Sequence, residues 1–229
     1  MKPHQIFFAF TISLCFIGLS AQAQSRAGLA FRLGHSQIQS DYDYEVDDQT
    51  FAYAPSFGAA VVYEMDLGAN DFIGLEFNYQ LIRGNETVKF DVPDSAAIGT
   101  IKEIQYRRSL SYFGIPIYYG WRMKEWEFMA GWYTGVLINS RSSVDAISAE
   151  GSSFLVYTTE EYFNSLPIKR LDFGPRIGIS RKVFDDFHFQ LLYYQGLARI
   201  GHEDSNWDAS NWSVNLGFSY LVPISKAYQ

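Results

Sequence analysis

The chain has 229 residues, a formal net charge of −7 and an aromatic content of 17%. An acidic chain lacks the basic face that nucleic-acid binding requires, so we expect no nucleic acid among its partners. It also contains no metal-ligand spacing, phosphate-binding loop or nucleotide fingerprint, so the sequence predicts no metal and no cofactor.

The first residues resemble a cleavable export signal. Lys2 stands near the start, an apolar stretch follows, and residues 21–23 form an A-x-A pattern. The only cysteine, Cys15, lies in this segment and is not preceded by the small residue that a lipoprotein signal carries. We therefore predict a signal peptide over 1–23 and one exported domain over 24–229. No later apolar run is long enough for a transmembrane helix.

Eight segments of alternating apolar and other residues follow in chain order. Alternation with period two is typical of a β-strand whose two faces meet different surroundings. In "SNWSVNLGFSYLV" every second residue from Trp212 to Val222 is apolar, and the run contains no charge. The predicted strands lie near residues 25–37, 51–65, 71–84, 103–121, 126–138, 169–181, 187–201 and 210–222.

The connections between these strands alternate between short and long. Tight turns follow the second, fourth and sixth strands, whereas the other connections span roughly 38–50, 85–102, 139–168 and 202–209. This is the plan of an outer-membrane barrel. The sequence thus predicts an all-β fold, an eight-stranded antiparallel up-and-down transmembrane β-barrel with both termini in the periplasm. A ten-stranded barrel is the alternative, because "SSFLVYTTEEYF" at 152–163 could form a hairpin.

Alternation alone does not separate a membrane barrel from a soluble, lipocalin-like barrel. Three features favour the membrane. Lysines after the signal fall only in loops, turns, strand ends or the tail, and aromatic residues gather at strand ends, as in interfacial girdles. The apolar face also carries too many aromatic side chains to fill the narrow interior of eight strands. We therefore expect the apolar face to meet lipid, and glycine, serine and a few charged residues to line the lumen.

Two segments resemble a known family. "SYFGIPIYYGWR" at 111–122 and "RLDFGPRIGIS" at 170–180 resemble strands four and six of the PorT-like outer-membrane barrels of Bacteroidetes-type Gram-negative bacteria. Gly114 departs from the pattern, since the family often has an acidic residue there. The resemblance implies an eight-stranded barrel in the outer membrane. Most relatives have no assigned activity, and the founding member is associated with a protein-secretion and gliding apparatus.

Strand parity directs several charged side chains into the lumen. These could form a charged constriction for a solute, or a structural salt-bridge network that packs the interior, which an eight-stranded barrel favours. A buried carboxylate needs partners, so we expect Glu76 to contact Arg32 or Arg176 while its neighbour Leu75 faces lipid. The predicted lumenal residues are Arg32, Glu76, Arg108, Glu127, Asp172 and Arg176.

Other candidate sites carry less weight. A lipid-modifying enzyme would combine a serine with His35, His188 or His202, but the predicted strand ends place His188 far from the other two. Asp94-Ser95-Ala96 matches a short O-glycosylation pattern, with Ser95 as the acceptor. The acidic residues over 41–48 could bind calcium, although such runs are usually only solvated.

The functional hypothesis is a non-enzymatic outer-membrane barrel of structural or surface-interaction type, with a filled lumen and long extracellular loops. An accessory of a secretion apparatus and a narrow channel or lipid-modifying enzyme are the alternatives. The expected partners are outer-membrane lipid and lipopolysaccharide, the barrel-insertion machinery, and a protein or glycan at the extracellular loops.

Overall fold

The computed structural model describes residues 24–42, 48–91, 100–148, 153–159, 171–198 and 207–224. The predicted signal peptide, Ser95, His202 and residues 43–47 of the acidic run lie outside these ranges. In the described ranges no helix is long and apolar enough to cross a membrane. The strands are β1 (Ser25–Tyr42), β2 (Asp48–Asp66), β3 (Asp71–Lys89), β4 (Ile101–Gly114), β5 (Ile117–Met123), β6 (Trp126–Ser148), β7 (Ser153–Thr159), β8 (Leu171–Lys182), β9 (Phe187–Gln195) and β10 (Trp207–Pro223).

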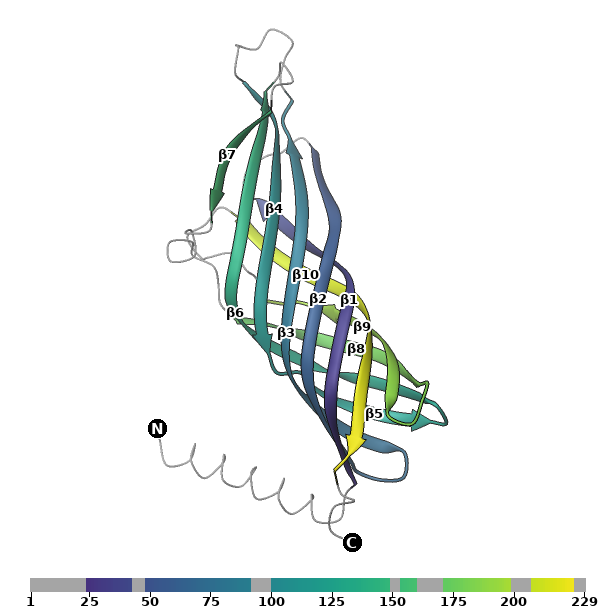
Figure 1. Cartoon of the computed structure of the whole chain (residues 1–229). Coiled ribbons are helices and arrows are strands. Elements are labelled where there is room, and N and C mark those ends of the chain that lie inside the picture. Colours follow the sequence, from purple (N-terminus) through teal and green to yellow (C-terminus); the bar gives the residue numbers. More distant parts are fainter. Residues whose placement is uncertain are drawn as a thin grey trace, which may run out of the picture.

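Strongly tilted strands form a closed barrel (Figure 1). Each strand of the ring pairs antiparallel with its neighbours, and β10 closes the ring on β1. The ring has eight positions in the described residues, because β4 and β5 together occupy the fourth one between β3 and β6. The predicted eight-stranded barrel is therefore confirmed.

The interruption between β4 and β5 lies at Pro116, which has no N–H to donate to the ladder. The flanking groups stay paired: the Ile115 N–H donates to the Thr134 carbonyl at 2.7 Å, and the Pro116 carbonyl accepts from the Glu76 N–H at 3.0 Å. The proline thus breaks one strand without opening the wall.

The predicted inside and outside of the wall are also observed. Along β10, Ser213 and Ser219 are at most 1% exposed, whereas Val214 is 37% and Phe218 is 61% exposed. Large apolar side chains stand outward on every strand of the ring, as a lipid-facing belt requires. Arg26 of β1 pairs with Pro223 of β10, so the first strand begins at the end of the barrel where the last strand finishes.

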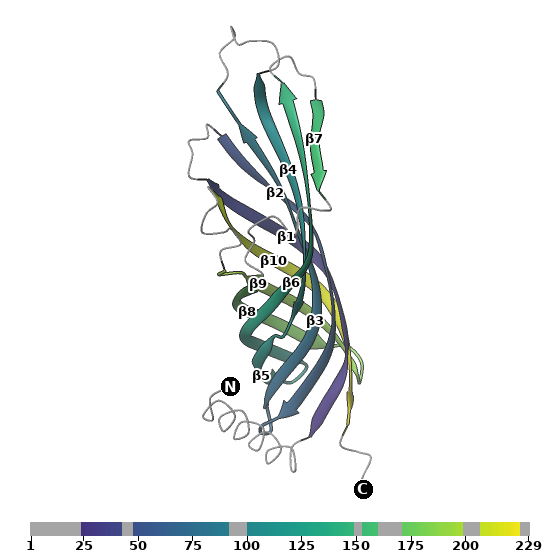
Figure 2. The ribbon, with the colours of Figure 1, turned by 90° about the vertical axis from the view of Figure 1, so that its left-hand side faces the viewer.

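One part of the wall rises well above the rest (Figure 2). The predicted loops 85–102 and 139–168 are wrong in part, because β3 continues to Lys89, β4 begins at Ile101 and β6 reaches Ser148. Above the apolar belt most outward residues are polar, with Tyr53 and Ile101 as exposed exceptions. The regular alternation that marks a lipid-facing strand is therefore lost while the hydrogen-bond ladder continues. We call residues 48–53, 84–89, 101–109, 140–148 and 153–159 the raised sheet.

The ten-stranded alternative is wrong. A strand does form in the expected segment, as β7, but among the described residues it pairs only with the upper part of β6 and stays outside the ring. The β6–β8 pairing ends at Val136 and Leu171, so β7 extends the raised sheet above the level where β8 begins.

On the opposite side, the upper half of β1 leaves the wall. Its pairing with β2 ends at Ser36, and beyond that residue it pairs only with β10. The Ser36 hydroxyl bonds the backbone of Arg83 in β3, accepting from its N–H and donating to its carbonyl, both at 2.8 Å. The β1–β10 ribbon therefore crosses toward the inner face of the raised sheet, where Gly84 leaves room for Ile38. A Cβ at Gly84 would lie 2.6 Å from the Ile38 nitrogen.

Candidate functional site

The middle of the lumen is occupied by one carboxylate between two guanidinium groups. Glu76 of β3 accepts two hydrogen bonds from Arg32 of β1, at 2.7 and 2.9 Å, and two from Arg176 of β8, at 2.8 and 2.9 Å. The three side chains are between 1% and 9% exposed. This is the contact that strand parity led us to expect for Glu76, and both candidate arginines make it. Bidentate pairing satisfies both carboxylate oxygens and joins three strands across the barrel.

A second charged cluster lies at the end of the barrel where β1 begins and β10 finishes, which is the periplasmic end in barrels of this plan. Arg26 donates to Glu64 at 2.5 Å and to Glu127 at 2.8 Å. Arg122 donates to the same Glu127 oxygen at 3.1 Å, and the His188 ring lies 3.3 Å from the other oxygen of Glu127. Both carboxylates are at most 5% exposed, so this cluster ties five strands together below the central one.

A third cluster joins β1 to the raised sheet. Glu86 of β3 accepts from Ser40 at 2.9 Å, from Gln49 at 2.7 Å and from Arg108 at 2.7 Å. The Gln49 amide also donates to the Ser40 carbonyl at 2.8 Å. Arg108 therefore faces inward as expected, and the cluster holds the β1–β10 ribbon against the sheet.

Aromatic side chains also fill the lumen, which corrects the expectation of a lumen lined by small and charged residues. Glycines on neighbouring strands make the space. A Cβ at Gly74 would lie 2.2 Å from the Tyr118 ring, and one at Gly114 would lie 2.4 Å from the Tyr133 ring. The buried lumenal aromatics are Phe72, Tyr112, Tyr118, Tyr133 and Tyr194.

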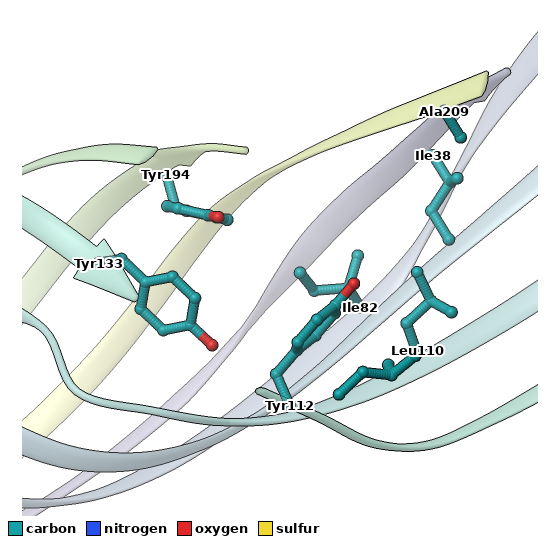
Figure 3. Packing of buried hydrophobic residues seen from close by; sticks show 8 residues of the cluster. Ile38, Ile82, Leu110, Tyr112, Tyr133, Tyr194 and Ala209 are labelled. Carbon is teal, nitrogen blue, oxygen red and sulfur yellow. The ribbon is translucent and has the colours of Figure 1, made fainter. Parts of the chain in front are cut away.

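A hydrophobic cluster forms a cap over the lumen at the end that carries the raised sheet. Figure 3 shows Ile38 and Ala209 of the β1–β10 ribbon opposite Ile82 and Leu110 of the wall, with Tyr112 beside Ile82 and with Tyr133 and Tyr194 further to the left. Asp172 lies beneath this cap, at 1% exposure, and accepts from Asn211 at 2.8 Å. The cap forms because β1 bends inward, which places an apolar layer over the polar lumen.

Little free space remains in the middle of the barrel. A cavity of about 20 Å³ lies between Arg32, Arg176, Tyr133 and Tyr194. That volume is enough for roughly one water molecule. The described residues thus form stacked layers: an ionic layer at the periplasmic end, an ionic and aromatic layer at the centre, and an apolar cap.

The catalytic alternative finds no geometric support in the described residues. His35 is exposed on the outer face, whereas the adjacent Ser36 is fully buried inside. His188 pairs with Ser219 near the periplasmic end, five residues along β10 from Val214, which pairs with His35. The described ranges also contain no group of three or more His, Cys, Asp and Glu residues that could hold a metal.

Strand parity placed all six predicted lumenal residues inside the barrel, although only Arg32, Glu76 and Arg176 share one cluster. It missed Arg26, Glu64, Glu86 and Arg122, which complete the other clusters. These residues sit at strand ends, where alternation is weak. A search for charges with lumenal parity beyond the apolar run would have found Glu64 and Glu86.

Comparison with solved structures returns outer-membrane barrels. Neisserial surface protein A is 12% identical, with a TM-score of 0.41, and the match covers 85% of this chain and 96% of that one. The attachment invasion locus protein Ail of Yersinia pestis, in complex with the heparin analogue sucrose octasulfate, is 10% identical, with a TM-score of 0.38 and coverages of 87% and 99%. The outer membrane protease OmpT of Escherichia coli is 9% identical, with a TM-score of 0.43 and coverages of 87% and 97%.

No curated protein matches the chain significantly. The family model described as "Outer membrane protein beta-barrel domain" matches residues 21–200, which is most of the chain. With the lipid-facing belt and the closed ring, this match places the chain in the outer membrane of a bacterium. The chain therefore belongs to the outer membrane protein beta-barrel domain family.

Proposed function

We propose that this protein is an outer-membrane barrel of structural and surface-interaction type, with a closed lumen and the raised sheet as its working surface. The observation that carries the proposal is the filling of the lumen. The Arg32–Glu76–Arg176 cluster spans the interior, and a cavity of about 20 Å³ lies beside it. Such layers in the described part of the chain would block a solute or a lipid chain.

The raised sheet supports the second half of the proposal. From Ile138 to Ser148, β6 climbs roughly 20–25 Å above the apolar belt, at about 3.3 Å per residue and a tilt near 40°. On the side away from β6, β7 has no partner strand among the described residues. An open strand edge can accept a strand from another protein. Barrels of this plan carry their long connections on the extracellular side, so the sheet would project from the cell.

Within this function we also propose the narrower assignments from the sequence. Residues 1–23 would direct export and be removed. Membership of the PorT-like barrels rests on residues 111–122 and 170–180, and it would place the source among Bacteroidetes-type bacteria. A protein or a glycan would bind at the extracellular end, and the barrel-insertion machinery would fold the chain into the membrane.

A deletion strain complemented with designed variants tests the proposal. One variant deletes residues 143–168, which removes the tip of β6 and all of β7 but keeps every β6 residue that pairs with β8. The control variant carries an epitope of similar size in the β8–β9 turn at 183–186, at the opposite end. Heat-modifiable gel migration would show that both barrels are folded.

The measurements are cell adhesion to protein-coated and polysaccharide-coated surfaces, and the set of secreted proteins. We expect the full chain and the turn variant to restore adhesion, the 143–168 deletion to fail, and secretion to be the same in all strains. Full adhesion by the deletion variant would contradict the role of the raised sheet. Loss of secreted proteins in the deletion strain would instead support the secretion accessory, and stable conductance of the pure protein in planar bilayers would support a channel.

A further inference from the structure

The outer face of the wall holds a groove of arginine and small polar residues just above the lipid-facing belt. Its cavity measures about 690 Å³ and lies over β3, β4 and β6, with Pro55 of β2 at one margin. Most of its lining residues, including Arg83, Ser109 and Arg141, stand in outward-facing rows, so the groove opens on the outer face of the wall.

The pairing register of β3, β4 and β6 determines which residues lie side by side in the groove. Tyr79, Phe113 and Val136 form one outward row across β3, β4 and β6, and all three are side chains of the belt. The next outward row is Leu81, Ser111 and Asn139, beside the exposed Ile138. On β4 and β6 the outward residues therefore change from apolar to polar between one row and the next.

The row above contains Arg83, Ser109 and Arg141. Adjacent strands are about 4.8 Å apart, so the two arginine backbones lie roughly 10 Å apart with the small Ser109 between them. Arg107 stands one row higher on β4 and forms an ion pair with Asp145. Three cationic side chains thus surround a floor of serine hydroxyls.

The height of this row suits a lipid headgroup. The arginine row is the second outward row above the Tyr79 row, four residues along β3, which places it roughly 10 Å higher at a strand tilt near 40°. The polar region of a bilayer extends about 5–8 Å beyond the hydrocarbon on each side. Long arginine side chains near this boundary reach along the surface toward headgroups.

We propose that the groove binds the phosphorylated headgroup of an outer-leaflet glycolipid, with Arg83 and Arg141 holding phosphate oxygens. Guanidinium groups recognise phosphate through paired, charge-assisted hydrogen bonds, and Ser109 and Asn139 add neutral hydrogen-bonding groups. The acyl chains of the same lipid would lie against Tyr79, Leu81 and Ile138 below. The positive charge is local, since the chain as a whole is acidic.

The test uses native mass spectrometry of the purified protein in detergent, with bisphosphorylated lipid A and its dephosphorylated form as probes. The variant is Arg83→Gln with Arg141→Gln, and the matched control is Arg181→Gln, an outward, half-exposed arginine at the other end of the barrel. We expect one bisphosphorylated lipid retained by the native chain and by the control. The double variant should bind at least about tenfold more weakly, because two charge-assisted contacts are lost.

Three results would overturn the proposal. The double variant could bind the lipid as tightly as the native chain, or the control could lose as much affinity as the double variant. Inorganic pyrophosphate at millimolar concentration could also displace the lipid completely, which would make the groove a site for free phosphate. Both substituted groove residues face outward and are exposed. Heat-modifiable gel migration would show whether the double variant folds. If the double variant does not fold, lipid binding by the single variants Arg83→Gln and Arg141→Gln tests the proposal in its place.

Discussion

Replacing Glu76 with alanine should leave two cations in the middle of the barrel without their counterion. Among the described residues, Arg32 would keep a weak contact to Gln190 at 3.4 Å. Arg176 would keep its position near the Tyr118 ring, with the guanidinium carbon 5.7 Å from the ring centroid. Four charge-assisted hydrogen bonds disappear together. Removing one partner of a buried ion pair costs about 3–5 kcal/mol. Because one carboxylate serves two arginines here, we expect the upper part of that range.

The assay is urea unfolding of the barrel refolded into lipid vesicles, followed by tryptophan fluorescence. Asn78→Ala is the matched control, since Asn78 is also lumenal and 4% exposed, lies two residues along β3 and belongs to no ion pair. We expect it to cost about 1 kcal/mol. A third variant replaces Arg32, Glu76 and Arg176 with leucine, and it should regain most of the stability because no unpaired charge remains. A Glu76→Ala cost below about 1 kcal/mol, or no recovery in the triple variant, would refute the reasoning.

Two further substitutions test the wall and the packing of the lumen. Leu216→Arg, in the middle of the lipid-facing part of β10, should lower the free energy of unfolding in vesicles by roughly 2–4 kcal/mol, and no loss would argue against lipid contact there. Gly114→Ala should cost about 1–3 kcal/mol because the new methyl group meets the Tyr133 ring. In a double-mutant cycle the cost should shrink when Tyr133→Leu is present, and strictly additive costs would show that the glycine does not make room for the ring.

The sequence predicts the barrel well because lipid imposes a simple rule. On a lipid-facing strand every second residue must be apolar, so the positions of Leu75 and Phe218 on the outside also fix Glu76 and Ser219 on the inside. This parity predicts that Arg32, Glu76 and Arg176 all face the lumen, although it does not give the distances between them.

The raised sheet could not be predicted in this way. Above the belt both faces meet water or other protein, and residues such as Glu86, Arg141 and Ser143 fall in predicted loops although they continue the ladder. Nor does parity show that β1 leaves β2 after Ser36, because that bend depends on the packing of Ile38 against Gly84.

Alternation alone does not predict the lumenal aromatics, because the room for each ring depends on a glycine on the adjacent strand. Tyr118 fits because Gly74 is its cross-strand neighbour, and Phe72 fits because Gly120 is opposite it. Pairs of glycine and aromatic residues with lumenal parity on adjacent strands are the signal that would have revealed a filled interior.

Cysteine reactivity along β10 tests the central claim most directly, because the described part of the chain contains no native cysteine. Ser213→Cys and Ser219→Cys are conservative changes at lumenal positions, and Val214→Cys and Phe218→Cys lie on the outer face. In native membranes we expect the outer pair to react with a membrane-soluble maleimide and not with a small water-soluble thiosulfonate, and the lumenal pair to react with neither. Rapid reaction of the lumenal pair with the thiosulfonate would reveal a water-filled pore and contradict the account.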